Sequence, residues 1–112
     1  MPTNNATNNY QTAANNLVNY NGVTQTIRFS ANVSSVTYTN FGRYIVNFNG
    51  SLANANYVTI VTASDSAGVY ESGPFINTDP PSPGPSVSQV PVALAGFNFY
   101  DADYFITAVF VP

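Results

Sequence analysis

Few residues of this chain could take part in acid–base or nucleophilic chemistry. The 112 residues include no His, Cys or Lys, so the side chains that commonly activate a serine are missing, and no G-x-S-x-G motif occurs. The acids are Asp65, Glu71, Asp79, Asp101 and Asp103. Only Asp101 and Asp103 are spaced as a hydrolytic pair could be, but an Asp in such a turn more commonly caps the turn. We therefore predict no catalytic residue and no enzymatic activity.

Metal binding is the other chemistry that acidic residues suggest. Asp101 and Asp103, together with backbone carbonyls, are the one candidate for a Ca²⁺ site. Calcium takes six or more oxygen ligands, and two carboxylates supply only part of that number. We therefore expect no metal and no other cofactor.

Both cations of the chain, Arg28 and Arg43, lie inside a strand-like stretch. Arg28 stands between Ile27 and Phe29, where a buried unpaired guanidinium would be costly. Its five donors could clamp backbone carbonyls or a carboxylate at a subunit boundary. The alternative is an exposed edge-strand cation that hinders aggregation between sheets. Arg43 follows a turn, so we expect it to be exposed at the start of a strand.

The composition excludes several classes of partner. Charged residues make up 6% of the chain, against about 25% in ordinary soluble domains, which favours a subunit of a permanent assembly. With a net charge of −3 and two arginines, the chain cannot neutralise a nucleic-acid backbone. Its apolar runs are far shorter than the ~20 residues of a membrane span. The first residues lack the basic and apolar regions of a signal peptide.

Alternation with a period of two predicts an all-β domain. Strands are expected within residues 33–39, 43–48, 56–64 and 103–111, with a turn at residues 40–42. Residues 1–16 form a polar N-terminal arm, and the six prolines of residues 71–91 predict a loop that is not a central strand. The expected fold is a single domain over residues 17–112, a compact antiparallel β-sandwich or barrel of jelly-roll-like form.

Two of the predicted strands, residues 57–64 and 104–111, are apolar on both faces. Either they lie centrally between two layers, or their second face meets another subunit. A chain of 112 residues has little material for a second covering layer, which favours a homo-oligomer. The predicted structural and interface residues are Arg28, Arg43, Tyr57, Tyr104, Phe105 and Phe110.

Four short stretches carry a family resemblance. They are VNYNG (residues 18–22), IRFSANVSSVT (27–37), FGRYIVNF (41–48) and LANANY (52–57). In this order and spacing they resemble a module repeated in virion proteins of tailed phages, including cyanophages, where it occurs in tail fibres and related appendages. Tyr20, Ile45 and Asn54 stand where that module usually has Phe, Thr and Asp. The resemblance covers about residues 17–64 and implies a non-catalytic β module, usually in a homo-oligomer.

Two functional classes follow as expectations. One is a capsid decoration, or cement, protein on the particle surface, which the short chain without a stalk sequence favours. The alternative is a tail-fibre or appendage module that binds a host-surface glycan or protein. The expected partners are copies of the chain, most simply as a trimer, and other virion proteins such as the major capsid protein. The expected location is the virion, after synthesis in the host cytoplasm.

Overall fold

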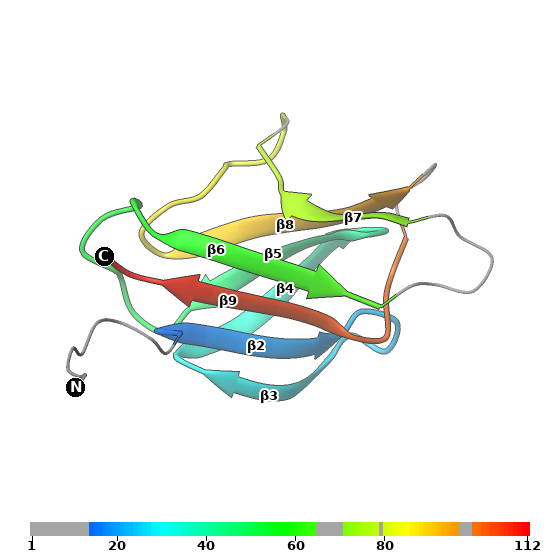
Figure 1. Ribbon diagram of the computed structural model, residues 1–112, viewed down its shortest axis with the longest axis horizontal. Helices are drawn as coiled ribbons and strands as arrows, with labels where there is room; N and C mark the ends of the chain where they lie inside the picture. The colour runs from blue at the N-terminus through cyan, green and yellow to red at the C-terminus, as the bar shows by residue number, and fades with distance from the viewer. Residues whose placement is uncertain (1–13, 65–70, 79, 97–99) are drawn as a thin grey trace, which may run out of the picture.

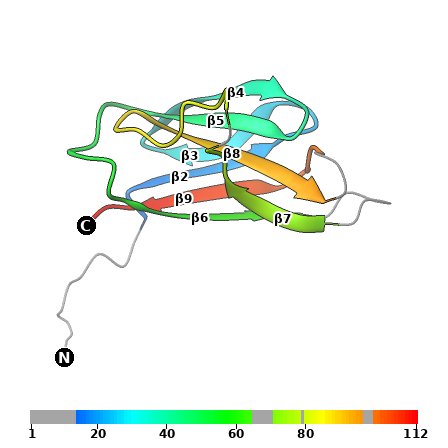
Figure 2. The same cartoon turned by 90° about the horizontal axis from the view of Figure 1, so that it is seen from above.

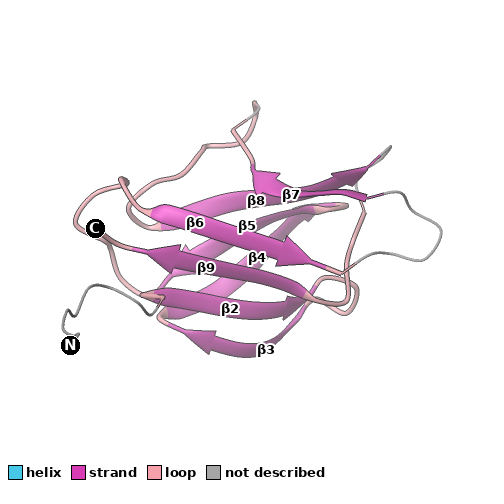
Figure 3. Cartoon of the chain, viewed as in Figure 1, coloured by secondary structure: helices cyan, strands magenta, loops and turns pink. Residues whose placement is uncertain are grey.

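The computed structural model describes residues 14–64, 71–78, 80–96 and 100–112. Within these ranges the chain forms β-strands and no α-helix (Figure 3). No helix in the described part is long and apolar enough to cross a membrane.

Eight strands build two antiparallel sheets of four strands each. In chain order they are β2 (Asn16–Asn21), β3 (Thr26–Ala31), β4 (Val33–Asn40), β5 (Arg43–Phe48), β6 (Val58–Ala63), β7 (Glu71–Ile76), β8 (Gln89–Gly96) and β9 (Phe105–Phe110). The order in one sheet is β3-β2-β9-β6, and the order in the other is β4-β5-β8-β7 (Figure 1). Figure 2 shows the two sheets as two layers. The predicted all-β class is confirmed, in its sandwich form.

The core lies between the two sheets and follows from the alternation in the strands. β2, β5 and β9 each alternate buried and half-buried residues along their length. β8 supplies Val90, Val92 and Leu94, all fully buried. Burying an aliphatic or aromatic side chain of this size stabilises a fold by about 1.5–3 kcal/mol. The inward face of each sheet is therefore the main source of stability.

Gly42 in the turn between β4 and β5 fixes one end of the sandwich. Its φ is +70°, and a Cβ built there would lie 2.7 Å from the Tyr100 nitrogen and 2.8 Å from the Leu94 carbonyl oxygen. Only glycine combines this backbone conformation with so close an approach. The turn predicted at residues 40–42 is therefore confirmed.

The loop predicted over residues 71–91 is shorter in the structure, because strands occupy both of its ends. Glu71–Ile76 forms edge strand β7, and β8 begins at Gln89, so only residues between these strands connect them. Pro74 lies on an edge, where a missing donor is tolerated. Pro91 lies in β8, between β5 and β7, contrary to the expectation of no central strand. Its carbonyl accepts from the Asn77 N–H at 2.9 Å, and its ring nitrogen points to the same side, past the end of β7. No hydrogen bond to β5 is lost.

The start of the domain also differs slightly from the expectation. β2 begins at Asn16, which is buried, and its Nδ2 donates to the Asn32 carbonyl at 2.7 Å. The Asn15 N–H donates to the Val109 carbonyl. Residues 1–13 of the predicted N-terminal arm lie outside the described residues.

Candidate functional site

The outer face of the β3-β2-β9-β6 sheet is apolar and open. Residues paired across neighbouring antiparallel strands share a face, so the registers Val58–Phe110, Ile60–Ala108 and Asn19–Phe29 place these side chains together on the side away from the core. We call this set the outer apolar face. Its described residues are Leu17, Asn19, Asn21, Thr26, Phe29, Ala31, Val58, Ile60, Thr62, Ile106, Ala108 and Phe110. Tyr104 belongs with them, because it precedes the buried Phe105 in the alternation and packs against Arg28. In Figure 1 the strands of this sheet lie in front of the other sheet.

Four large side chains of this face are well exposed, while Leu17, Ile106 and Phe110 are half-buried. Val58, Phe29, Ile60 and Tyr104 are 61, 57, 56 and 51% exposed. The prediction that strands at residues 57–64 and 104–111 are apolar on both faces therefore resolves into one face in the core and one in solvent. Isolated exposed apolar residues are ordinary, but a contiguous group on one sheet is typical of an interaction site.

Arg28 lies at the rim of this face and joins three segments. Its Nη1 donates to the Asp103 carbonyl at 2.5 Å and lies 3.4 Å from Asn19 Oδ1. Its guanidinium carbon lies 3.9 Å from the centre of the Tyr104 ring, within the range of a cation–π contact. Arg28 is thus exposed on edge strand β3 and clamps β2 and the segment before β9 within the chain. The clamp at a subunit boundary stays a prediction.

Asp101 lies at the end of the sandwich and connects its two sheets. Its Oδ1 accepts from the Tyr44 hydroxyl at 2.6 Å and from the Gly42 N–H at 2.7 Å, and its Oδ2 accepts from the Tyr38 hydroxyl at 3.0 Å. The three donors belong to the β4–β5 hairpin, whereas Asp101 leads into β9 of the other sheet. The cluster acts as a structural tie.

The electrostatics of this cluster keep its tyrosines protonated. Burial, followed by the hydrogen bond to Asp101, raises the pKa of Tyr44 far above its ordinary value near 10. Burial and the Asp101 charge also raise the pKa of Tyr20, whose ring packs edge-on against Tyr44 with centroids 5.4 Å apart. Protonated phenols donate to a carboxylate, so the cluster is arranged for binding Asp101 and not for releasing protons.

The candidate pair Asp101 and Asp103 is divided between two environments. Three donors already converge on the Asp101 carboxylate, and a calcium ion would have to displace them. Asp103 is exposed, and its backbone carbonyl accepts from Arg28. Among the described residues, no group of three or more acidic, His or Cys side chains could hold a metal ion.

The other predicted structural residues have different positions. Phe105 is buried, with its ring centroid 4.9 Å from that of Tyr44. Tyr57 faces the core edge and donates to the Ser86 carbonyl at 2.9 Å. Phe110 and Tyr104 lie on the outer apolar face. Arg43 begins β5, as expected, but it is half-buried and lines a pocket on the opposite sheet.

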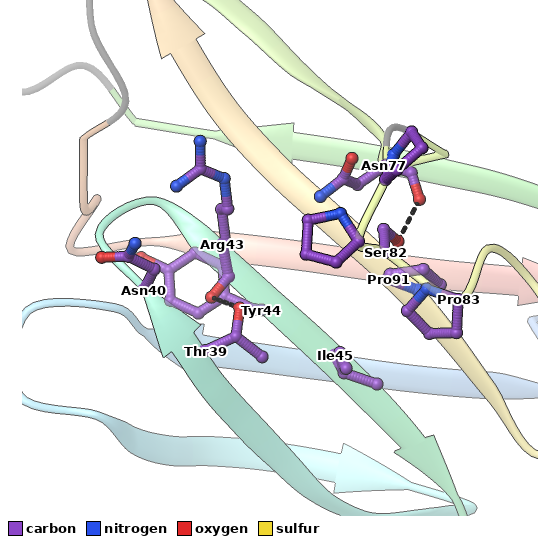
Figure 4. Close-up of a pocket in the computed structure, with 11 residues that line it drawn as sticks. Thr39, Asn40, Arg43, Tyr44, Ile45, Asn77, Ser82, Pro83 and Pro91 are labelled. Atoms are coloured by element: carbon purple, nitrogen blue, oxygen red, sulfur yellow. Dashed lines mark hydrogen bonds between the residues drawn. The ribbon is translucent and has the colours of Figure 1, made fainter.

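That pocket lies on the outer side of the β4-β5-β8-β7 sheet (Figure 4). It has a volume of about 440 Å³. Its lining comes from the β4–β5 hairpin, β8 and the proline-rich segment, and consists of Thr39, Asn40, Arg43, Tyr44, Ile45, Asn77, Pro80, Pro81, Ser82, Pro83 and Pro91. The segments are far apart in sequence, so no local pattern indicated a pocket here.

Comparisons with protein-family models, with curated proteins and with solved structures find no match to this chain.

Proposed function

We propose that this protein is a non-enzymatic structural subunit of a phage particle surface, which assembles with copies of itself through the outer apolar face. The observation that carries the proposal is the exposure of Phe29, Val58, Ile60 and Tyr104 on one side of one sheet. The family resemblance of residues 17–64 supports the assignment to a phage virion.

The size of the face fits an interface between subunits. Four strands about 4.8 Å apart, with six residues rising about 3.3 Å each, give a flat area of roughly 400 Å². Side-chain relief and the Arg28 rim add to this area. A standard interface buries about 800 Å² per partner, so the flat area is about half of one side of such an interface. Side-chain relief and the rim supply the rest of a single contact.

The charge of the face favours a second copy of the chain as the occupant. Among the residues that the structure describes, the outer apolar face contains no charged side chain, and Arg28 stands at its rim with the exposed Asp103 near it. Identical copies therefore meet without opposing like charges across the apolar surface. Two such sheets can pack face to face, as the two layers of a sandwich do.

Capsid decoration is the favoured role, because weak contacts to a repeating lattice add up when an oligomer presents several of them at once. The second candidate is a tail-fibre or appendage module that binds a host receptor, and the pocket on the opposite sheet favours it.

Quantitative staining of purified virions against the major capsid protein distinguishes the two roles. Hundreds of copies per particle are expected for decoration, while a few dozen copies that co-purify with tails would contradict it. Assembly through the outer apolar face is tested separately, by light scattering of the purified protein.

A further inference from the structure

On the sheet opposite to the outer apolar face, the outer side of β4 is polar, whereas β8 and β7 present Pro91, Ala93 and Phe75 on the same side. Asn47 Nδ2 donates to Ser35 Oγ at 3.0 Å and to Thr37 Oγ1 at 2.9 Å, which makes a row of amide and hydroxyl groups across β4 and β5. This row therefore differs in chemistry from the outer apolar face. In an oligomer built through the outer apolar face, this side of the sandwich points away from the neighbouring subunits.

The pocket on this side has an apolar floor. Ile45 of β5 and Pro91 of β8 are paired in register and lie side by side on the outer side of the sheet. Figure 4 shows Thr39, Asn40 and Arg43 on one side of them and Asn77, Ser82 and Pro83 on the other. The volume of about 440 Å³ falls in the range of small-molecule sites.

The polar groups of the pocket are held in place by backbone contacts. Thr39 Oγ1 donates to the Arg43 carbonyl at 3.0 Å, and Ser82 Oγ donates to the Asn77 carbonyl at 2.7 Å. Ser82 Oγ also accepts from the Gly84 N–H at 3.3 Å, and each hydroxyl oxygen keeps at least one lone pair that can accept from a ligand. Asn40 Oδ1 accepts from the Phe41 N–H at 2.7 Å, which orients its amide NH₂ group as a donor. Groups that are already ordered lose little entropy on binding.

We infer that this pocket binds a saccharide of one or two rings. A sugar presents hydroxyls that both donate and accept, which matches the fixed acceptors Thr39 and Ser82 and the donor Asn40. The C–H faces of a sugar ring are rigid and apolar, and Ile45, Pro83 and Pro91 offer a rigid apolar surface. Arg43 brings the one charge among the described lining residues, and its donors suit a ring hydroxyl or a sugar carboxylate.

The inference goes beyond the proposed structural role, since it concerns the other sheet and does not depend on assembly. Its test is a titration of the isotope-labelled full chain with methyl glycosides of glucose, galactose, mannose and N-acetylglucosamine, and with galacturonate, followed by amide NMR shifts. At least one probe is expected to bind in the millimolar range and to shift the amide signals of Thr39, Asn40 and Ser82. The galacturonate arm distinguishes acidic from neutral sugars. If no probe shifts these signals, or if the shifts lie elsewhere, the inference is wrong.

A matched pair of variants locates the site. Ile45→Trp fills the pocket and is expected to weaken binding at least tenfold. Thr37→Trp is the control, since Thr37 is the cross-strand partner of Ile45 on the same side of the sheet but does not line the pocket. It should bind as the wild type does. Thr39→Val keeps the shape, removes the hydroxyl and should weaken binding at least threefold. Unchanged binding by Ile45→Trp, or equal loss in both tryptophan variants, would overturn the assignment.

Discussion

The hydroxyl of Tyr44 donates a 2.6 Å hydrogen bond to the carboxylate of Asp101, and this contact joins the two sheets at one end of the sandwich. The two residues are 57 positions apart in the chain. The same carboxylate accepts from Tyr38 and from the Gly42 N–H. Asp101, one of the two acidic residues considered as a catalytic or metal-binding pair, is therefore part of the contact that holds the two sheets together.

Replacing Asp101 tests this structural role. Asp101→Ala leaves two tyrosine hydroxyls and the Gly42 N–H without their acceptor, so we expect the free energy of unfolding to fall by about 2–4 kcal/mol. The control Asp103→Ala removes an exposed side chain and should change it by less than about 0.5 kcal/mol. Urea unfolding followed by tyrosine fluorescence measures both. Equal losses in the two variants would show that Asp101 is not a special contact.

Gly22 gives a second test of the same cluster. A Cβ at this position would lie 2.5 Å from Tyr44 Oη and 2.9 Å from the Ala102 carbonyl oxygen. Gly22→Ala should therefore destabilise the fold by about 1–3 kcal/mol, as overpacking does. In a Tyr44→Phe background the nearest clashing atom is gone, so the penalty of Gly22→Ala should drop by about 1 kcal/mol. Strict additivity of the two changes in urea unfolding would contradict the arrangement.

The tyrosines predict a loss of stability in alkali. Burial raises the pKa values of Tyr20, Tyr38, Tyr44 and Tyr57. The folded chain then keeps protons that the unfolded chain releases above pH ~10, so the contribution of these tyrosines to stability is constant below that pH and falls as the pH rises past it.

Tyr44→Phe removes one of these groups. The slope of unfolding free energy against pH above 10 should become shallower by up to about 1.4 kcal/mol per pH unit, although the variant is less stable at neutral pH. Chemical unfolding at a series of pH values from 8 to 11.5 measures the slope. The same slope in Tyr44→Phe and in the wild type would refute this account of the cluster.

The strands that the sequence revealed are those with local alternation. β5, β6 and β9 each repeat apolar residues every second position, and β4 does so at Val36 and Tyr38. The structure has these strands within a few residues of the predicted ranges. β7 was missed because Gly73 and Pro74 obscure its pattern, and its pairing with β8 depends on a distant segment. The sequence could not show which face of β6 and β9 is buried in the core, since both faces are apolar. The packing of the second sheet determines which face is covered.

The features of the site that the sequence did not predict depend on contacts between residues far apart in the chain. The Asp101 tie joins positions 57 to 63 residues apart, and Arg28 reaches a carbonyl 75 residues away. Local periodicity contains no information on such pairs. The side chains that β6 and the Tyr104–Phe110 stretch contribute to the outer apolar face, by contrast, were visible in the sequence as the second apolar set of two strands. The structure showed that they share one side of one sheet with Phe29 of β3.

The central claim, that the outer apolar face joins copies of this chain, is tested most directly by the mass of the protein in solution. Size-exclusion chromatography with light scattering should give a multiple of the 11.9 kDa chain mass. Face-to-face packing of two outer apolar faces is an isologous contact and gives a dimer, whereas the trimer expected from the sequence gives three copies.

Val58→Glu places a charge on the face and should give the monomer. Val23→Glu is the matched control, because Val23 is 57% exposed, close to the 61% of Val58, but lies in the β2–β3 turn, and this variant should keep the wild-type mass. A wild-type mass of 11.9 kDa at micromolar concentration, or an oligomer that Val58→Glu leaves intact, would contradict the account.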